Sequence, residues 1–175
     1  AHSAQHDFLT GLPNRLLLKD RIESAIAIAP RHAKKVAVLF LDLDGFKHIN
    51  DSLGHAVGDK LLQSIGKRLE GCVRGSDTVS RQGGDEFVVL LSEVEHAEDA
   101  ALTARRMLQA IAEPHLIDQH ELHITTSVGV SIYPDDGLDA EVLVKSADIA
   151  MYQAKADGRQ SYQFFMPAMN VQAVE

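Results

Sequence analysis

The most informative run of this sequence is VAVLFLDLD, at positions 36–44. Val36–Leu43 is β-branched and largely apolar with almost no alternation, which predicts a strand covered on both faces. The run ends in Asp42 and Asp44, which the two-residue period of a strand places on the same side. Carboxylates are costly to leave unpaired beside a buried strand. These acids therefore either cap the segment that follows or contribute to a binding site, and we interpret Asp44 as structural.

Apolar residues at helical spacing on both sides of this strand predict four amphipathic helices. The first helix has Asn14 as its N-cap and ends near Pro30, and the second begins near Asp59. The third covers positions 101–111, and the fourth is closed by Gly158 in the C-cap role. The marker positions are Leu18, Ile22, Ile26, Leu61, Ile65, Leu69, Ala101, Ala104, Leu108, Ile111, Leu143, Ala147, Met151 and Ala154.

Short apolar segments between and after these helices predict the rest of a sheet. Gly83-Gly84 separates two of them and is the residue type that tight hairpin turns with positive φ require. Strands joined through helices and one hairpin predict an α/β (α+β) sandwich of the ferredoxin-like and polymerase-palm type, with a mixed, mainly antiparallel sheet and flanking helices. The predicted strands are Asp77–Arg81, Phe87–Leu91, His115–Ile117, Leu122–Tyr133 and Tyr162–Phe165.

Length, composition and charge narrow the class of protein. The 175 residues are 45% apolar and 24% charged, as expected for one globular domain. Seventeen basic against 25 acidic residues give a net charge of −8, which argues against binding a nucleic acid polymer through a basic surface. No apolar run reaches the length of a membrane span, and the single Cys72 fits a cytoplasmic domain. An acidic chain that binds an anion such as a nucleotide requires divalent cations and a few well-placed basic side chains.

A second group of acids lies on the predicted hairpin. Gly83-Gly84-Asp85-Glu86-Phe87 places two carboxylates directly before an apolar run. The two glycines let a bulky ligand approach the backbone, and the acids could complete an oxygen-ligand site for a divalent ion with Asp42. Turns also carry Gly and Asp for conformational reasons alone.

Four ordered motifs resemble the GGDEF family of diguanylate cyclases. The signature GGDEF stands at positions 83–87, DFLTGLPNR at 7–15 resembles the family's opening motif, and DLDGFKHIND at 42–51, with GH at 54–55 and GD at 58–59, resembles its nucleotide-site segment. AMYQAK at 150–155 with GR at 158–159 is similar to its late phosphate-binding helix. The resemblance implies a palm-like fold and the condensation of two GTP molecules into cyclic di-GMP with release of two pyrophosphates, using Mg²⁺ or Mn²⁺.

The resemblance also implies roles for individual residues. Asp42 and Asp85 would be metal ligands with the Leu43 carbonyl as a third. Glu86 would be a further ligand or the group that eases deprotonation of the ribose 3′-hydroxyl, which makes Asp85 and Glu86 the catalytic pair. The substrate-binding residues would form three groups. Asn50 and Asp59 would bind the guanine base, and Gly83 and Gly84 would form the turn beside the substrate. The β- and γ-phosphates would be neutralised by Lys47, Lys155 and Arg159.

An Arg-x-x-Asp pair upstream of the hairpin matches the spacing of the family's inhibitory site for its own product. Arg74 and Asp77 suit a guanine ligand, because an arginine can stack on the base while the carboxylate accepts from its N1 and N2 donors. A second arginine from the third helix would complete this site. Arg105 is the closer match and Arg106 is its neighbour.

The alternative function is a catalytically silent module that binds GTP or cyclic di-GMP and regulates a neighbouring domain. We expect a lead-in at 1–12, the GGDEF domain at 13–166, and a connector at 167–175. FFMPAMN at 164–170 resembles the connector into an EAL phosphodiesterase domain, so we expect fused EAL and sensory domains in a larger parent protein, for which attachment to a membrane stays open. Catalysis by one site per domain further predicts a transient homodimer, without membrane contact by this domain.

Overall fold

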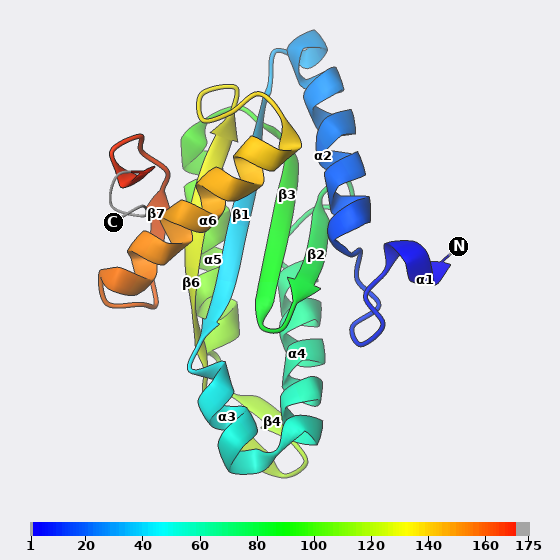
Figure 1. The fold of residues 1–175 in the computed structure, drawn as a ribbon, viewed down its shortest axis with the longest axis vertical. Coiled ribbons are helices and arrows are strands. Elements are labelled where there is room, and N and C mark those ends of the chain that lie inside the picture. Colours follow the sequence, from blue (N-terminus) through cyan, green and yellow to red (C-terminus); the bar gives the residue numbers. More distant parts are fainter. Residues whose placement is uncertain (1, 171–175) are drawn as a thin grey trace.

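A computed structural model describes residues 2–170 of the chain, and it has helices on both faces of one sheet (Figure 1). The five strands of this sheet are β1 (Lys35–Asp44), β2 (Thr78–Gly83), β3 (Glu86–Val94), β6 (Thr125–Tyr133) and β7 (Tyr162–Phe164). Their order is β2-β3-β1-β6-β7, and every pair is antiparallel except β6 with β7. The predicted mixed, mainly antiparallel sheet is confirmed.

The helices form two layers. They are α1 (His2–Gln5), α2 (Arg15–Ile28), α3 (Phe46–Leu53), α4 (His55–Glu70), α5 (Ala97–Ala112) and α6 (Ala140–Ala156). Figure 1 shows α2 and α6 on one face of the sheet and α4 and α5 on the other. Within residues 2–170, no helix has both the length and the apolar character needed to cross a membrane.

The central strand β1 divides the core into two halves. Val36, Val38 and Phe40 pack in the cluster under α2 and α6, whereas Leu39 and Leu41 belong to the larger cluster under α4 and α5. Residues 36–41 are all buried. The predicted strand with two covered faces is therefore confirmed, and burial of each large side chain contributes about 1.5–3 kcal/mol to folding.

The local signals for the first helix and the hairpin also hold. Asn14 caps α2 by accepting a 3.1 Å hydrogen bond from the Leu17 backbone nitrogen. Gly83 and Gly84 adopt φ values of +140° and +51°, in the region that favours glycine. The strands that they join, β2 and β3, are each longer than predicted.

Several predicted boundaries are wrong. Residues 46–53 form α3, a short helix that was not predicted, although Phe46, Ile49 and Leu53 stand at helical spacing and pack against the core. Helix α4 begins at His55 rather than near Asp59, after a break at Gly54, whose φ is +93°. The predicted strand over 122–133 is divided, because β5 (His120–Leu122) pairs with β4 (His115–Ile117) in a separate two-stranded sheet before β6 begins.

The expected termini are only partly described. The lead-in at 1–12 contains α1 and a turn in which Asp7 and Leu12 are linked by a 2.7 Å backbone hydrogen bond. Of the expected connector, positions 171–175 lie outside the described residues.

Substitution of Gly129 by alanine tests the contact between the sheet and α6. A Cβ at Gly129 would overlap the Ala147 carbonyl oxygen and the Met151 backbone nitrogen, so the helix has to move away from β6. We expect Gly129→Ala to lower the free energy of unfolding by about 3 kcal/mol, as overpacking against a rigid backbone does. Urea denaturation measures this loss. Gly75→Ala is the control, because a Cβ there meets nothing within 4 Å. Equal stability of the two variants would contradict the packing.

Candidate functional site

The carboxylates of Asp42 and Asp85 come together where β1 meets the hairpin turn. Asp42 lies opposite Glu86 in the β1–β3 register, and the Leu43 nitrogen donates a 3.3 Å hydrogen bond to the Asp85 carbonyl. The end of the central strand is thereby joined to the turn that follows Gly83. The sequence prediction that Asp42, Leu43 and Asp85 are neighbours agrees with this geometry.

The charge balance around Asp42 is unfavourable without a cation. Burial raises the pKa of Asp42 to about 7, the nearby Asp85 carboxylate adds to this effect, and the Lys155 ammonium opposes it. The Lys155 Nζ lies 3.6 Å from Asp42 Oδ1. A second positive charge between the two carboxylates would relieve their repulsion.

The donor chemistry of this corner fits Mg²⁺ or Mn²⁺. Two carboxylates and the Leu43 carbonyl are hard oxygen ligands, which these ions prefer. Across residues 2–170, no three His, Cys, Asp or Glu side chains already form a metal-binding cluster. Phosphate oxygens of a nucleotide or water would therefore have to complete the coordination, as is usual for Mg²⁺.

The hairpin turn leaves room for a ligand. A Cβ at either Gly83 or Gly84 would meet nothing within 4 Å. Arg81 fixes the turn from behind, because its Nε and Nη2 donate to the Gly84 carbonyl at 3.1 and 2.8 Å. The same guanidinium forms a 2.8 Å ion pair with Asp7. The opening motif and the GGDEF turn are thus one connected unit.

Asn50 and Gly58 form a close contact between α3 and α4. The Asn50 Oδ1 is buried, has no hydrogen-bond partner and packs against Gly58, whose missing side chain makes room for it. A buried acceptor without a partner is costly, so an amide turned toward a ligand donor would gain a hydrogen bond. Asp59 is exposed next to Gly58, and it stands in the second turn of α4 rather than in the first turn that the sequence suggested.

The predicted phosphate-binding cations approach from two sides. Lys47 is exposed on α3. Lys155, near the end of α6, forms a 2.9 Å ion pair with Asp44. Arg159 is exposed in the loop after α6 and has a φ of +64°. The structure brings Lys155 to the carboxylate pair, whereas no contact within the described residues fixes the side chains of Lys47 and Arg159.

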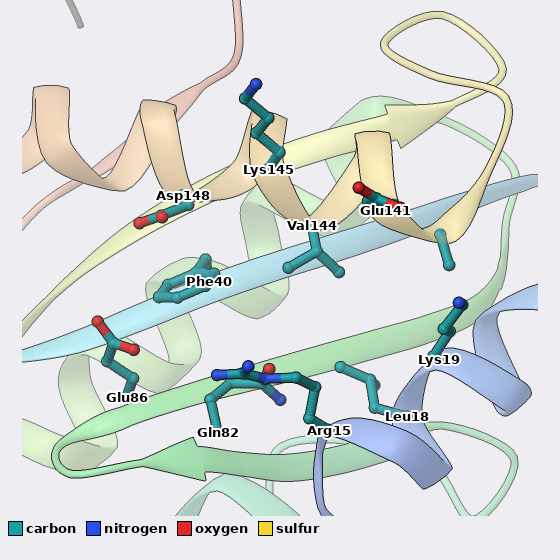
Figure 2. A pocket seen from close by; sticks show the side chains of 11 residues that line it. Arg15, Leu18, Lys19, Phe40, Gln82, Glu86, Glu141, Val144, Lys145 and Asp148 are labelled. Atoms are coloured by element: carbon teal, nitrogen blue, oxygen red, sulfur yellow. The ribbon is translucent and has the colours of Figure 1, made fainter.

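A pocket of about 430 Å³ opens beside the hairpin, between α2 and α6 (Figure 2). Leu18, Phe40 and Val144 line it with apolar surface, and Glu86 and Asp148 stand together at one end. Burial and the charges of Asp148 and Asp85 raise the pKa of Glu86, with Arg15 opposing them, and burial raises the pKa of Asp148. Glu86 thus lies between the Asp148 carboxylate on α6 and the Asp42–Asp85 pair.

Sequence reasoning missed Arg15 and Asp148 as members of this pocket. Arg15 ends the DFLTGLPNR motif and lies at the first position of α2. Asp148 precedes Lys155 by seven residues, which puts both on one face of α6. That spacing was a usable signal for Asp148.

The predicted inhibitory pair borders a second pocket, of about 440 Å³, which is also lined by Arg106. Arg105, the closer match in the sequence, does not line this pocket and donates a 2.9 Å hydrogen bond to the Tyr162 hydroxyl, so the geometry favours its neighbour Arg106 as the second arginine. The Asp77 side chain is only 2% exposed and accepts hydrogen bonds from the Arg74 and Ser92 backbone nitrogens. The Arg74 side chain is 70% exposed.

Comparisons with known proteins agree with the motifs. A family model described as diguanylate cyclase, GGDEF domain, matches residues 4–161. The chain is 49% identical over 172 residues to a bifunctional diguanylate cyclase/cyclic di-GMP phosphodiesterase, MucR of Pseudomonas aeruginosa, a match that covers 98% of this chain and 25% of the relative. It is 42% identical over 162 residues to the diguanylate cyclase TpbB of that species, a match that covers 92% of this chain and 37% of the relative.

Solved structures show the same fold. The GGDEF domain of TpbB from Pseudomonas aeruginosa superposes with a TM-score of 0.93 at 38% identity, covering 97% of this chain and 99% of that one. The coiled coil and GGDEF domain of DgcB from Caulobacter crescentus, in complex with c-di-GMP, gives a TM-score of 0.82 at 25% identity, covering 93% and 86%. The chain spans a quarter or less of the length of the first curated relatives that it matches.

The Asn50–Gly58 contact yields a test of the nucleotide pocket. A Cβ at Gly58 would overlap the Asn50 Oδ1, and the amide, as the end of a flexible side chain, is the group that moves. We expect Gly58→Ala to weaken the binding of 3′-deoxy-GTP by about tenfold, the effect of one displaced hydrogen-bonding group, with little change in thermal stability. Isothermal titration calorimetry measures the affinity. Gly66→Ala in the same helix is the control, because its Cβ would meet only apolar side chains, Leu12 at 3.1 Å and Phe87 at 4.0 Å. An equal effect of both variants would exclude the Asn50 pocket.

Proposed function

Because the chain belongs to the GGDEF domain family of diguanylate cyclases, we propose that it condenses two GTP molecules into cyclic di-GMP and two pyrophosphates. The observation that carries the proposal is the Asp42–Asp85 pair, held by the Leu43 to Asp85 backbone hydrogen bond at a turn with open space in front of it. Such a corner can bind a cation and a phosphate chain together, which phosphoryl-type transfer requires.

Each GTP is bound at its two ends. The Asn50 amide and the Asp59 carboxylate accept from the N1 and N2 donors of guanine, which adenine does not offer in the same positions. Lys47, Lys155 and Arg159 neutralise the β- and γ-phosphates. They therefore also stabilise the negative charge that develops on the leaving pyrophosphate. The nucleotide therefore lies across the end of β1, with its α-phosphate in front of the GGDEF turn.

Asp42, Leu43 and Asp85 would hold Mg²⁺ or Mn²⁺, which when bound neutralises phosphate charge and acidifies the attacking hydroxyl. Glu86 stands next to this corner with a raised pKa. A carboxylate whose pKa is shifted toward neutrality is suited to take the proton of the 3′-hydroxyl. Burial raises the pKa of Glu86 most, and the Asp148 charge across the pocket adds to this effect and thereby supports the role.

One domain binds one GTP, whereas the product contains two identical 3′→5′ linkages. Two half-sites must therefore face each other across a two-fold axis, so that each presents its 3′-hydroxyl to the α-phosphate held by the other. The dimer needs to exist only during turnover.

A second candidate function is binding of cyclic di-GMP without catalysis. It is favoured by the pocket that Arg74, Asp77 and Arg106 line, and a structural relative, DgcB, was solved in complex with c-di-GMP. The two functions are compatible, since the same pocket would act as a product-inhibition site in an active enzyme. Chromatographic detection of cyclic di-GMP after incubation with GTP separates the active enzyme from the silent module.

The parent protein is proposed to contain further domains. The relatives named above include a bifunctional diguanylate cyclase/cyclic di-GMP phosphodiesterase, and a solved structural match is described as an EAL/GGDEF domain protein from M. capsulatus. We infer a fused EAL domain and a sensory domain that sets the activity of this one.

Removal of the metal ligands is the first test of catalysis. Asp85→Asn and Asp42→Asn each remove one charge from the proposed metal corner, and we expect each to lower GTP turnover by a factor of ~10² or more, the loss that follows removal of a transition-state charge contact. The rate of pyrophosphate release measures this. Asp20→Asn, at an exposed position of α2, is the control and should retain activity. Wild-type turnover that persists in excess chelator would refute the metal assignment.

Dilution tests the shared active site. We expect specific activity to rise with protein concentration until dimers dominate, because each monomer lacks the second half-site. A coiled coil fused ahead of the domain should raise activity at low concentration by increasing the effective concentration of the partner. Flat specific activity across about a hundredfold dilution, in a sample that ultracentrifugation shows to be monomeric, would be inconsistent with the two-fold mechanism.

A further inference from the structure

Asp44 is the most connected acidic side chain next to the proposed phosphate site. Its side chain is 6% exposed and accepts four hydrogen bonds. Thr125 Oγ1 and Ser127 Oγ donate at 2.7 and 2.8 Å, Lys155 Nζ at 2.9 Å, and the Gln160 backbone nitrogen at 3.3 Å. These donors come from β6, from α6 and from the loop after α6.

The two hydroxyl donors fix the carboxylate itself. Thr125 lies directly opposite Asp44 in the β1–β6 register, and Ser127 lies opposite Asp42, two residues along. Together with the Lys155 ammonium, these hydroxyls hold the Asp44 carboxylate in one orientation at the rim of the sheet.

The other two donors belong to the chain segment that carries the cations. Gly158, Arg159 and Gln160 are consecutive residues with φ values of +114°, +64° and +48°. Arginine and glutamine seldom adopt this region, so surrounding contacts must hold the segment. The Gln160 hydrogen bond to Asp44 is one such contact, and the Arg159 nitrogen donates to the Ala154 carbonyl at 3.0 Å.

We propose that Asp44 is a positioning residue for triphosphate binding, which holds the Lys155 ammonium and the backbone of the Arg159 loop in place for the β- and γ-phosphates. The inference rests on the proposed function and goes beyond it, since Asp44 itself touches no reacting atom. It also revises our interpretation of Asp44 as only a structural acid.

The chemistry of an ammonium group permits this arrangement. A lysine Nζ has three N–H donors, and Asp44 uses one of them at 2.9 Å. The remaining donors can reach a phosphate while the side chain stays anchored. The Lys155 Nζ also lies 3.6 Å from Asp42. Without Asp44, it would pair with Asp42 instead and compete with the proposed metal ion for that carboxylate.

The decisive variant is Asp44→Asn, which keeps the size of the side chain but removes its charge. We expect its affinity for 3′-deoxy-GTP with Mg²⁺ to fall by about tenfold or more, the order expected for a lost charge-assisted contact, while its affinity for GMP changes less than about twofold. GMP keeps the guanine and lacks the β- and γ-phosphates. Isothermal titration calorimetry of both ligands gives the two ratios, and the KM for GTP should rise more than kcat falls.

The matched control is Asp136→Asn at the opposite end of β6, where the carboxylate accepts a 2.8 Å hydrogen bond from the Ile132 nitrogen. It should cost thermal stability without changing either affinity. A double-mutant cycle with Lys155→Met adds a second readout: if Asp44 acts through Lys155, Asp44→Asn should weaken 3′-deoxy-GTP binding much less in the Lys155→Met background than in the wild type.

Two outcomes would overturn the inference. One is an equal loss of affinity for GMP and for 3′-deoxy-GTP, which would show a general disturbance of the site. The other is unchanged affinity for both ligands, with thermal stability lowered as in Asp136→Asn. Either result leaves the proposed function intact if the wild type forms cyclic di-GMP from GTP, whereas a wild type that forms none refutes catalysis independently of Asp44.

Discussion

The whole arrangement depends on a central strand that has no solvent-facing side. Both faces of β1 are covered, so a carboxylate on this strand is tolerated only where the strand leaves the core, at Asp42 and Asp44. The strand period turns both toward α6, whose Lys155 reaches both. The location of the charged site is thus a consequence of packing. The apolar run of β1 determines how far the core extends, and the carboxylates lie at the end of that run.

The hairpin is the second fixed element of the site, and its rigidity has a separate origin. Gly83 and Gly84 provide the backbone conformation, but without side chains they would leave the turn free to move. Arg81 limits that freedom by contacting the Gly84 carbonyl and the Asp7 carboxylate at once. One side chain thus links the lead-in to the turn that carries Asp85.

Periodicity and motif content were sufficient to predict β1, the hairpin, the four long helices and the meeting of Asp42 with Asp85. They were insufficient where a contact between distant parts of the chain determines the local structure or the orientation of a side chain. Helix α3 has only eight residues, and its apolar positions Phe46, Ile49 and Leu53 span about two turns, so its period is too short to stand out beside the longer helices. Arg105 and Arg106 are adjacent on α5 and point in directions about 100° apart, and only the rotation of that helix against the sheet selects Arg106 for the second pocket. The encounter of Glu86 with Asp148 joins a hairpin to a helix more than sixty positions away.

The scarcity of positive charge at this site has a thermodynamic consequence. Asp85 and Glu86 add negative charge around Asp42, and the Lys155 ammonium near Asp42 is already paired with Asp44. A triphosphate that entered this corner alone would add negative charge to an acidic pocket, and a metal ion alone would find an incomplete set of ligands. Each would therefore improve the site for the other, and linkage would make the gain reciprocal: the factor by which Mg²⁺ raised the affinity for GTP would be the factor by which GTP raised the affinity for Mg²⁺. Under the proposed function, nucleotide and metal would then act as one ligand, and Asp44 would keep the Lys155 ammonium on the phosphate side of it.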